Sequence, residues 1–179
     1  LPKQQQLGII GGETIRSVSM RILATFILSA SLVSTGASAF DSEHLKQLKE
    51  TNACSKCDLS DADLSDLDLA KAKINRTNLS GANLSGANLM FANLVGSRFI
   101  GANMTEINLS AANASGANLK GANLTDAKLI RSRLRGANLA ETDLTGANMK
   151  GANLSDISQD KAIFCNTIMS DGRVERSGC

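Results

Sequence analysis

Residues 82–101 read ANLSG ANLMF ANLVG SRFIG, and the five-residue unit visible here organises most of the chain. An apolar residue, usually Leu, returns at every fifth position from Leu59 to Leu154, through twenty pentads without a slip. Two positions before it comes a small residue, usually Ala, and Asn or Asp most often lies between them. A period of five is neither the 3.6 of a helix nor the 2 of a strand, so it indicates a repeat architecture.

A coil built from pentads explains the pattern. If each pentad forms one side of the coil, Leu and Ala point inward and the other three positions point outward. If four pentads close one coil, which the period alone does not establish, Leu89, Leu109 and Leu129 should be buried and stacked. Glycine at the fifth position would tolerate the corner dihedrals. Stacking at a strand spacing of about 4.8 Å would pair the backbones of successive coils, and Asn side chains would form ladders such as Asn118–Asn138.

This pattern resembles that of the pentapeptide-repeat family, over residues 57–164. The resemblance implies an all-β fold, a right-handed quadrilateral β-helix, here of about five to six coils. The opening T-N-x-C-x-x-C-D-L at residues 51–59 and the ending that begins F-C-N-T at residue 164 resemble small exported members from cyanobacteria. Some of those relatives belong to the thylakoid lumen.

The N-terminal segment is typical of an export signal. Residues 1–19 carry no clear pattern, and Met20 is the expected start. Arg21, an apolar run over residues 22–33 and the A-x-A sequence at residues 37–39 predict a secretory signal peptide over residues 20–39. The alternative, a membrane anchor, is disfavoured because the run is short for about 30 Å of hydrocarbon. We therefore expect an exported protein of the periplasm or thylakoid lumen, without stable membrane insertion after cleavage.

Both ends of the repeat region are expected to carry caps, because a solenoid exposes its core there. Residues 40–56 form the predicted N-terminal cap, with a short helix from Asp41 to Ala53 that presents Leu45 and Leu48 on one face. Residues 165–179 form the predicted C-terminal tail, with a small hairpin around the Asp-Gly turn at residues 171–172. Covered ends predict a monomer. The single histidine, His44, is expected on the surface of the helix.

Four cysteines lie at the two ends, and in an exported protein a disulfide is the default expectation. They are Cys54, Cys57, Cys165 and Cys179. A C-x-x-C sequence also occurs in redox sites and metal sites, but no βαβ context surrounds this one, and zinc would need four ligands. If the solenoid forms, its ends lie on the order of 24 Å apart, too far for a disulfide. This leaves Cys54–Cys57 and Cys165–Cys179, with a redox-active Cys54/Cys57 pair as the alternative.

The net charge argues against a strongly basic and against a strongly acidic protein. Without residues 1–39, the 19 basic and 17 acidic residues become 16 of each. A net charge of zero disfavours both a binder of polyanions such as nucleic acids and a polyanion mimic. Five aspartates gather in the first coil, where calcium binding is conceivable, but their spacing follows the outward positions of the repeat and favours a solvated face. They are Asp58, Asp61, Asp63, Asp66 and Asp68.

A mixed basic and apolar strip on the outward positions is the best candidate for a partner-binding site, because Arg and Phe are enriched at interfaces. The alternative is scattered surface variation. The strip consists of Met90, Phe91, Val95, Arg98, Ile130, Arg131, Arg133 and Arg135.

No catalytic constellation is visible: the chain has no Tyr or Trp, a single His and no phosphate-binding glycine loop. We expect no cofactor and no metal. The sequence favours a non-enzymatic structural or protein-interaction solenoid. One alternative, implied by the resemblance, is a DNA-mimicking inhibitor of the topoisomerase gyrase, which the neutral charge and the export signal disfavour. The other is a thiol-disulfide protein that uses Cys54 and Cys57.

Overall fold

A computed structural model describes residues 40–179, so the predicted upstream segment and signal peptide lie outside the described residues. The framework is a ladder of parallel single-residue bridges that join each second pentad position to the residue twenty further on, from Ala53–Lys73 to Asn148–Ile168. Each coil therefore has four sides, and the predicted four-sided β-helical solenoid is confirmed. The ladder reaches a few residues beyond 57–164 at both ends, because backbone pairing does not require the side chains of the repeat.

We number the four sides from Cys57, and each side returns every twenty residues. Side 1 begins with residues 57–61, side 2 with 62–66, side 3 with 67–71 and side 4 with 72–76. Residues 52–56 join side 4 because Ala53 bridges to Lys73. Since the sides follow one another around a closed coil, sides 2 and 4 face in opposite directions.

Backbone hydrogen bonds run up and down the stack. The Leu84 N–H donates to the Asn103 carbonyl in the next coil (2.7 Å), and the Asn103 N–H donates back to Ala82 (3.0 Å). Between sides, the Ala87 N–H donates to the Leu84 carbonyl (3.1 Å), which turns the chain at the corner. The fifth position of the pentad adopts the left-handed region whether or not it is glycine, as at Gly116 (φ 66°) and Phe91 (φ 61°).

The interior is a column of the predicted inward residues. Leu89, Leu109 and Leu129 are each at most 2% exposed, which confirms their predicted burial. Column positions that depart from Leu are also buried, including Phe99 and Ala114. The core is therefore continuous from coil to coil, as expected when each repeat contacts only its neighbours.

The second position favours Asn because its side chain closes a local turn. Asn83 Oδ1 accepts the Ser85 N–H (3.3 Å), while its Nδ2 donates to Asp63 Oδ1 in the preceding coil (3.1 Å). The predicted amide ladder is thus present at some rungs only. It joins the pairs 58–78, 63–83, 68–88, 83–103 and 88–108. No side-chain bond joins Asn118 to Asn138 among the described residues; each instead accepts an N–H two residues on.

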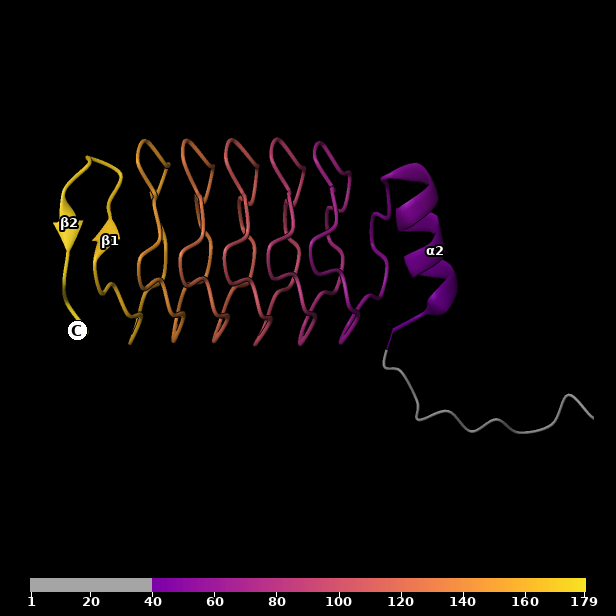
Figure 1. Ribbon diagram of the computed structural model, residues 1–179, viewed down its shortest axis with the longest axis horizontal. Helices are drawn as coiled ribbons and strands as arrows, with labels where there is room; N and C mark the ends of the chain where they lie inside the picture. The colour runs from indigo at the N-terminus through magenta and orange to yellow at the C-terminus, as the bar shows by residue number, and fades with distance from the viewer. Residues whose placement is uncertain (1–39) are drawn as a thin grey trace, which may run out of the picture. The chain divides into compact units, whose positions relative to one another are not determined.

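A helix and a hairpin flank the coils, as Figure 1 shows. Helix α2 (Ser42–Thr51) begins after Asp41, whose Oδ1 accepts the Glu43 N–H, and ends at Asn52 in the left-handed conformation. Leu48 of α2 is fully buried against the core. Strands β1 (Thr167–Ile168) and β2 (Val174–Glu175) pair antiparallel. The predicted helix and the predicted small hairpin are both present.

Candidate interaction surface

A shallow depression of about 630 Å³ lies along side 3. It follows two columns of outward residues, the fourth and fifth pentad positions, in which side chains twenty residues apart stack. Ser110 and Ala111 are small, and they lie between the larger pair Met90 and Phe91 on one side and Ile130 and Arg131 on the other. The lining residues are Met90, Phe91, Ser110, Ala111, Ile130, Arg131, Lys150, Gly151 and Ser170.

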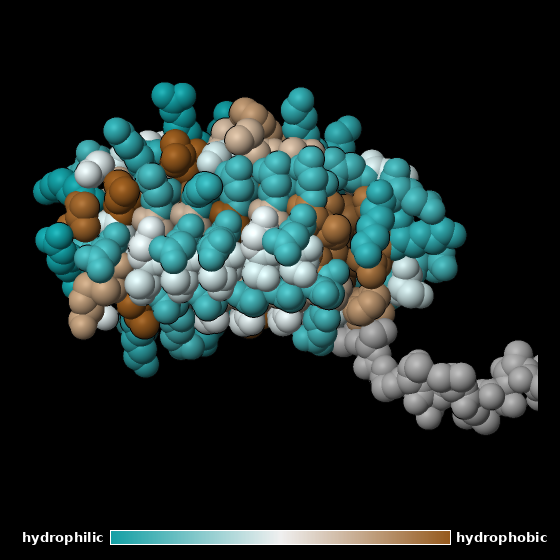
Figure 2. All heavy atoms as spheres, viewed as in Figure 1, coloured by the Kyte–Doolittle hydropathy of each residue, from teal (hydrophilic) through white to brown (hydrophobic). Residues whose placement is uncertain are grey.

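Phe91 is the exposed large apolar residue of this surface. The residue is 58% exposed, and its backbone occupies the left-handed region, which is rare for a bulky residue. A glycine would fill this corner without the backbone cost, so an exposed aromatic ring here is unfavourable for the folded chain taken alone. The same conformation recurs at the fifth position of every pentad, so the exposed aromatic ring, and not the backbone, distinguishes this corner. Figure 2 shows one face of the solenoid, where hydrophilic residues predominate and apolar residues lie in separate patches.

Basic groups border the apolar floor. Arg131 and Lys150 are exposed, and neither has a carboxylate within ion-pair distance in the part of the chain that the structure describes. A Cβ atom at Gly151 would lie 3.3 Å from Cγ of Arg131, so the glycine leaves room for the arginine stem. The depression therefore offers an aromatic ring, aliphatic groups and unpaired cations, a combination suited to a partner with apolar and acidic groups.

The structure brings together only half of the predicted strip. Met90, Phe91, Ile130 and Arg131 share the depression. The other four residues lie outside it: Arg133 is on the neighbouring side 4, together with Val95 and Arg135, and Arg98 is on side 1. Arg135 pairs with Asp156, with 3.3 Å between Nε and Oδ2, and both side chains are largely exposed.

Sequence reasoning missed the lower part of the depression. Lys150 and Ser170 continue the column of Met90, and Gly151 continues that of Phe91. Counting onward by twenty from Met90 and Phe91 would have found all three residues. The predicted strip ends at Ile130 and Arg131 in these columns, and it adds neighbours along the chain such as Val95 and Arg98.

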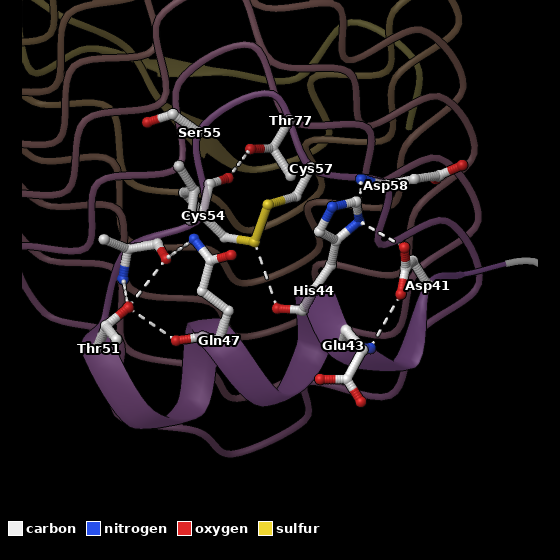
Figure 3. Close-up of a disulfide and its surroundings, with 12 residues drawn as sticks. Asp41, Glu43, His44, Gln47, Thr51, Cys54, Ser55, Cys57, Asp58 and Thr77 are labelled. Carbon is white, nitrogen blue, oxygen red and sulfur yellow. Dashed lines mark hydrogen bonds and ion pairs between the residues drawn. A yellow bond between two sulfur atoms is a disulfide. The ribbon is translucent and has the colours of Figure 1, made fainter.

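The Cys54–Cys57 disulfide links the segment that follows α2 to the start of the first coil (Figure 3). Cys54 is fully buried and Cys57 is 5% exposed. Cys54 Sγ lies 3.3 Å from the His44 carbonyl oxygen, and His44 Nδ1 accepts the Asp58 N–H (3.2 Å). Because thiol–disulfide exchange requires an accessible sulfur, this environment favours a structural bond over a redox-active one.

A second disulfide, Cys165–Cys179, holds the C-terminal tail, with 4.7 Å between the Cα atoms. The Phe164 N–H donates to the Ser177 carbonyl (3.0 Å), so the tail also pairs with the backbone of the last pentad. Neither disulfide connects the two ends of the solenoid.

The acidic first coil is hydrogen-bonded within itself. The Ser60 hydroxyl and N–H donate to Asp58 and hold the pKa of this carboxyl below its ordinary value of 3.8, with a further donor in Asn78. Donation from Ser65 lowers the pKa of Asp63 in the same way. Within residues 40–179, no group of three or more His, Cys, Asp or Glu side chains is arranged to hold a metal ion. In the same range, no helix is long and apolar enough to cross a membrane.

The sequence matches the family described as pentapeptide repeats over residues 54–89, 87–126 and 122–157. Among solved structures, it is similar to Rfr23, a pentapeptide repeat protein from the cyanobacterium Cyanothece 51142, with 29% identity and a TM-score of 0.65 over 72% of this chain and 98% of that chain. It also matches a thylakoid-lumen pentapeptide repeat protein from Arabidopsis thaliana, with 26% identity and a TM-score of 0.29 over 65% and 71% of the two chains. HetL from Nostoc, which is involved in heterocyst differentiation regulation, matches with 29% identity and a TM-score of 0.25 over 69% and 70%. No curated protein matches significantly.

Proposed function

The chain belongs to the pentapeptide-repeat family, whose members fold as right-handed quadrilateral β-helices, and we propose that it is a non-enzymatic solenoid that binds a protein partner. The observation that carries this proposal is the depression on side 3, where an exposed Phe91 at a left-handed corner lies beside the unpaired cations of Arg131 and Lys150. The partner is a protein with apolar and acidic groups. No cofactor is required.

The two ends serve as caps in this proposal. α2 covers the first coil through Leu48 and the buried Cys54–Cys57 disulfide, and residues 165–179 cover the last coil. The domain division is then residues 1–19, the signal peptide 20–39, the N-terminal cap 40–56, the solenoid 57–164 with about five to six coils, and the tail 165–179. Covered ends prevent end-to-end stacking of solenoids, so the chain is a monomer at micromolar concentration in physiological salt.

Export to the periplasm or thylakoid lumen rests on the signal-peptide pattern of residues 20–39. The test is the mass of the protein recovered from the native compartment, or from a bacterial periplasm after expression of the full chain. Cleavage after Ala39 gives a chain that begins at Phe40. Recovery of the uncleaved chain from the cytoplasm would contradict export.

The partner site is tested by crosslinking capture from the native compartment with three forms of the protein. The first is the wild type, and the second carries Phe91→Ser and Arg131→Ser. The third is a matched control with Arg98→Ser and Ile100→Ser, which removes one arginine and one apolar side chain from side 1. We expect a partner that the wild type and the control capture and the second form loses. If all three forms captured the partner equally and their circular dichroism were unchanged, the depression would not be the partner-binding site.

The two alternatives find less support. A mimic of duplex DNA needs a strongly negative surface, whereas residues 40–179 carry 16 basic and 16 acidic residues, and the five carboxylates of side 2 are offset by five basic residues on side 4. A supercoiling assay with gyrase tests this alternative directly. A thiol-disulfide protein needs accessible sulfur atoms, whereas Cys54 and Cys57 are buried. Thiol titration of the native protein tests the second alternative.

A further inference from the structure

The net charge of zero conceals a separation of charge between opposite sides of the solenoid. Side 2 carries five carboxylates and no Lys or Arg. Its charged residues are Asp63, Asp66, Glu106, Asp126 and Asp143. Side 4 carries five cations and one carboxylate. Its charged residues are Lys56, Lys73, Arg76, Arg133, Arg135 and Asp156.

These charges are available to a partner. Every cation of side 4 is exposed, as are all the carboxylates of side 2 except the partly exposed Asp143. Among the described residues, Arg135 is the one side 4 cation with a carboxylate within ion-pair distance, that of Asp156. Side 2 holds its carboxylates in place: Asp63 Oδ1 accepts hydrogen bonds from Ser65, and Asp66 and Asp126 lie against the glycines of the next coil. Donation from Ser65 lowers the pKa of the Asp63 carboxyl most, and Lys49 of α2 lowers it further from the N-terminal end.

Opposite charges fall on the same coil in two of the coils. The first coil, residues 57–76, carries Asp63 and Asp66 on side 2 and Lys73 and Arg76 on side 4. In the fourth coil, residues 117–136, Asp126 on side 2 corresponds to Arg133 and Arg135 on side 4. The second coil has no charged residue on either side, the third has Glu106 on side 2 alone, and the fifth has a carboxylate on each side. Complementarity without a shift along the axis therefore rests on the first and fourth coils.

We propose that side 4 docks on side 2 of a second copy of this chain, in parallel and in register, so that solenoids associate side by side. The chain runs in opposite directions along these two sides, because they lie across the coil from each other. A plain sideways translation then brings Lys73 level with Ser65, next to Asp66, and Arg76 level with Ala62, next to Asp63. In the fourth coil it likewise brings Arg133 next to Asp126.

The symmetry of the association follows from the charges. A two-fold dimer buries the same patch on both partners, and here it would set five cations against five cations or carboxylates against carboxylates. The heterologous contact of side 4 with side 2 is complementary, and translation leaves one free side 2 and one free side 4 at the ends of each row. Side 3 of every copy then faces the same way, so the depressions align along the row. This inference goes beyond the proposed function and does not depend on it.

The association is sensitive to salt. Exposed ion pairs are individually weak, and charges are screened beyond about 8 Å at physiological ionic strength but only beyond about 30 Å at 0.01 M. The chain is therefore a monomer at micromolar concentration in physiological salt, and rows form at low salt or at high local concentration.

Charge-swap variants test the pairing by sedimentation velocity at about 10 mM and about 150 mM salt. We expect the wild type to show a larger average mass at the low salt only. Lys73→Glu with Arg76→Glu, and separately Asp63→Lys with Asp66→Lys, should each return the protein to the monomer at low salt. An equimolar mixture of the two variants should associate again, since the reversed side 4 of one complements the reversed side 2 of the other.

A matched control separates pairing from net charge. Arg98→Glu with Lys161→Glu changes the net charge of side 1 by the same amount as the side 4 variant, and it should leave most of the association intact. A mixture that stays monomeric, or a control as disruptive as the side 4 variant, would overturn the proposal, and so would a wild type that remains monomeric at about 10 mM salt.

A measurement on the wild type covers the case in which a variant misfolds. Carbodiimide crosslinking of mixed ¹⁴N and ¹⁵N chains at low salt should yield intermolecular peptides that join Lys73 to Asp66. If crosslinks formed between other sides and the Lys73–Asp66 crosslink were absent, the proposed register of side 4 on side 2 would be wrong. The readouts use purified protein alone, so their failure is distinguishable from failure of the partner capture described above.

Discussion

At the scale of single residues, the first pentad position shows how buried hydroxyl groups are hydrogen-bonded in the interior. Where Thr or Ser replaces Ala, the hydroxyl usually donates to a carbonyl 23 residues earlier, in the preceding coil. This holds for Thr77, Ser97, Thr142 and Thr167. Ser132 is the exception: its hydroxyl is buried and has no partner within residues 40–179. The same substitution in the sequence therefore has opposite consequences in different coils.

The first prediction compares two serines. Ser132→Ala should stabilise the fold by about 1 kcal/mol, because it removes a buried hydroxyl that makes no hydrogen bond. Ser97→Ala should destabilise it by about 1–2 kcal/mol, because Ser97 Oγ donates to the Ile74 carbonyl and accepts the Thr77 N–H, which would lose its partner. Urea denaturation of both variants measures the two signs. Destabilisation of similar size in both would contradict the assigned hydrogen bonds.

The second prediction concerns Asp58 and pH. Its pKa is lowered in the folded chain, chiefly by the Ser60 hydroxyl, so the folded state favours the charged carboxyl. The resulting stabilisation is present above the ordinary pKa of 3.8 and is lost as the pH falls through the lowered value. Asp58→Asn should therefore show a smaller loss of stability than the wild type between pH 5 and pH 2.

Ser60→Ala supplies the control for this pH dependence. It keeps the carboxylate and removes the principal donor, so it should reduce the acid sensitivity as Asp58→Asn does. The measurement is the urea midpoint at a series of pH values. Equal slopes for the wild type and both variants would show that Asp58 is not a source of the acid sensitivity.

At the scale of elements, each side of a coil depends on the turn that the second position closes. Asn118 Oδ1 accepts the Lys120 N–H (3.2 Å), and most other second positions act alike. Lysine and arginine at this position, as at Arg98, cannot accept such a bond. Their sides lack this turn-closing bond and are held by other contacts, such as the bond from the Arg98 N–H to the Thr77 carbonyl (2.9 Å).

The third prediction follows from this difference. Arg98→Asn should stabilise the fold by about 0.5–1.5 kcal/mol, because the new carbonyl can accept the Ile100 N–H. Asn118→Ala should destabilise it by a similar amount, since the Lys120 N–H loses its acceptor. The thermal midpoints of both variants provide the measurement. If Arg98→Asn destabilised the fold, the arginine side chain would have a stabilising role beyond the hydrogen bonds described here.

The fourth prediction concerns the C-terminal tail. The Cys165–Cys179 disulfide closes a loop for which chain entropy gives roughly 3 kcal/mol, whereas Cys54–Cys57 closes a very short one. Cys179→Ser should therefore speed amide exchange near Met149 and Leu154, and Cys54→Ser should have a smaller effect. Exchange followed by mass spectrometry resolves the coils. If the amide exchange rates of the last coils were unchanged after Cys179→Ser, the disulfide-bonded tail would not contribute to the stability of these coils.

At the scale of the whole molecule, the sequence predicted most of the fold and little of its surface. The five-residue register was sufficient to identify the buried residues, such as Leu109, because packing along one column depends on local order alone. The surface depends on residues twenty apart, so Lys150 and Gly151 were missed and Arg98 was placed in a strip that the structure divides. The net charge did not reveal the charge separation between sides 2 and 4, because it adds up all charges regardless of the side on which they lie.

The fifth prediction tests the central claim, which is that every coil spans twenty residues and pairs with the next through its backbone. Scalar couplings across hydrogen bonds, measured by NMR, identify the carbonyl that each amide contacts. The structure predicts couplings from Leu84 N to the Asn103 carbonyl carbon and from Asn103 N to that of Ala82. The same offsets, nineteen residues forward and twenty-one back, should recur through the solenoid. Couplings at helical offsets of four residues, or at offsets that vary along the chain, would contradict the fold and with it the columns and charged sides described here.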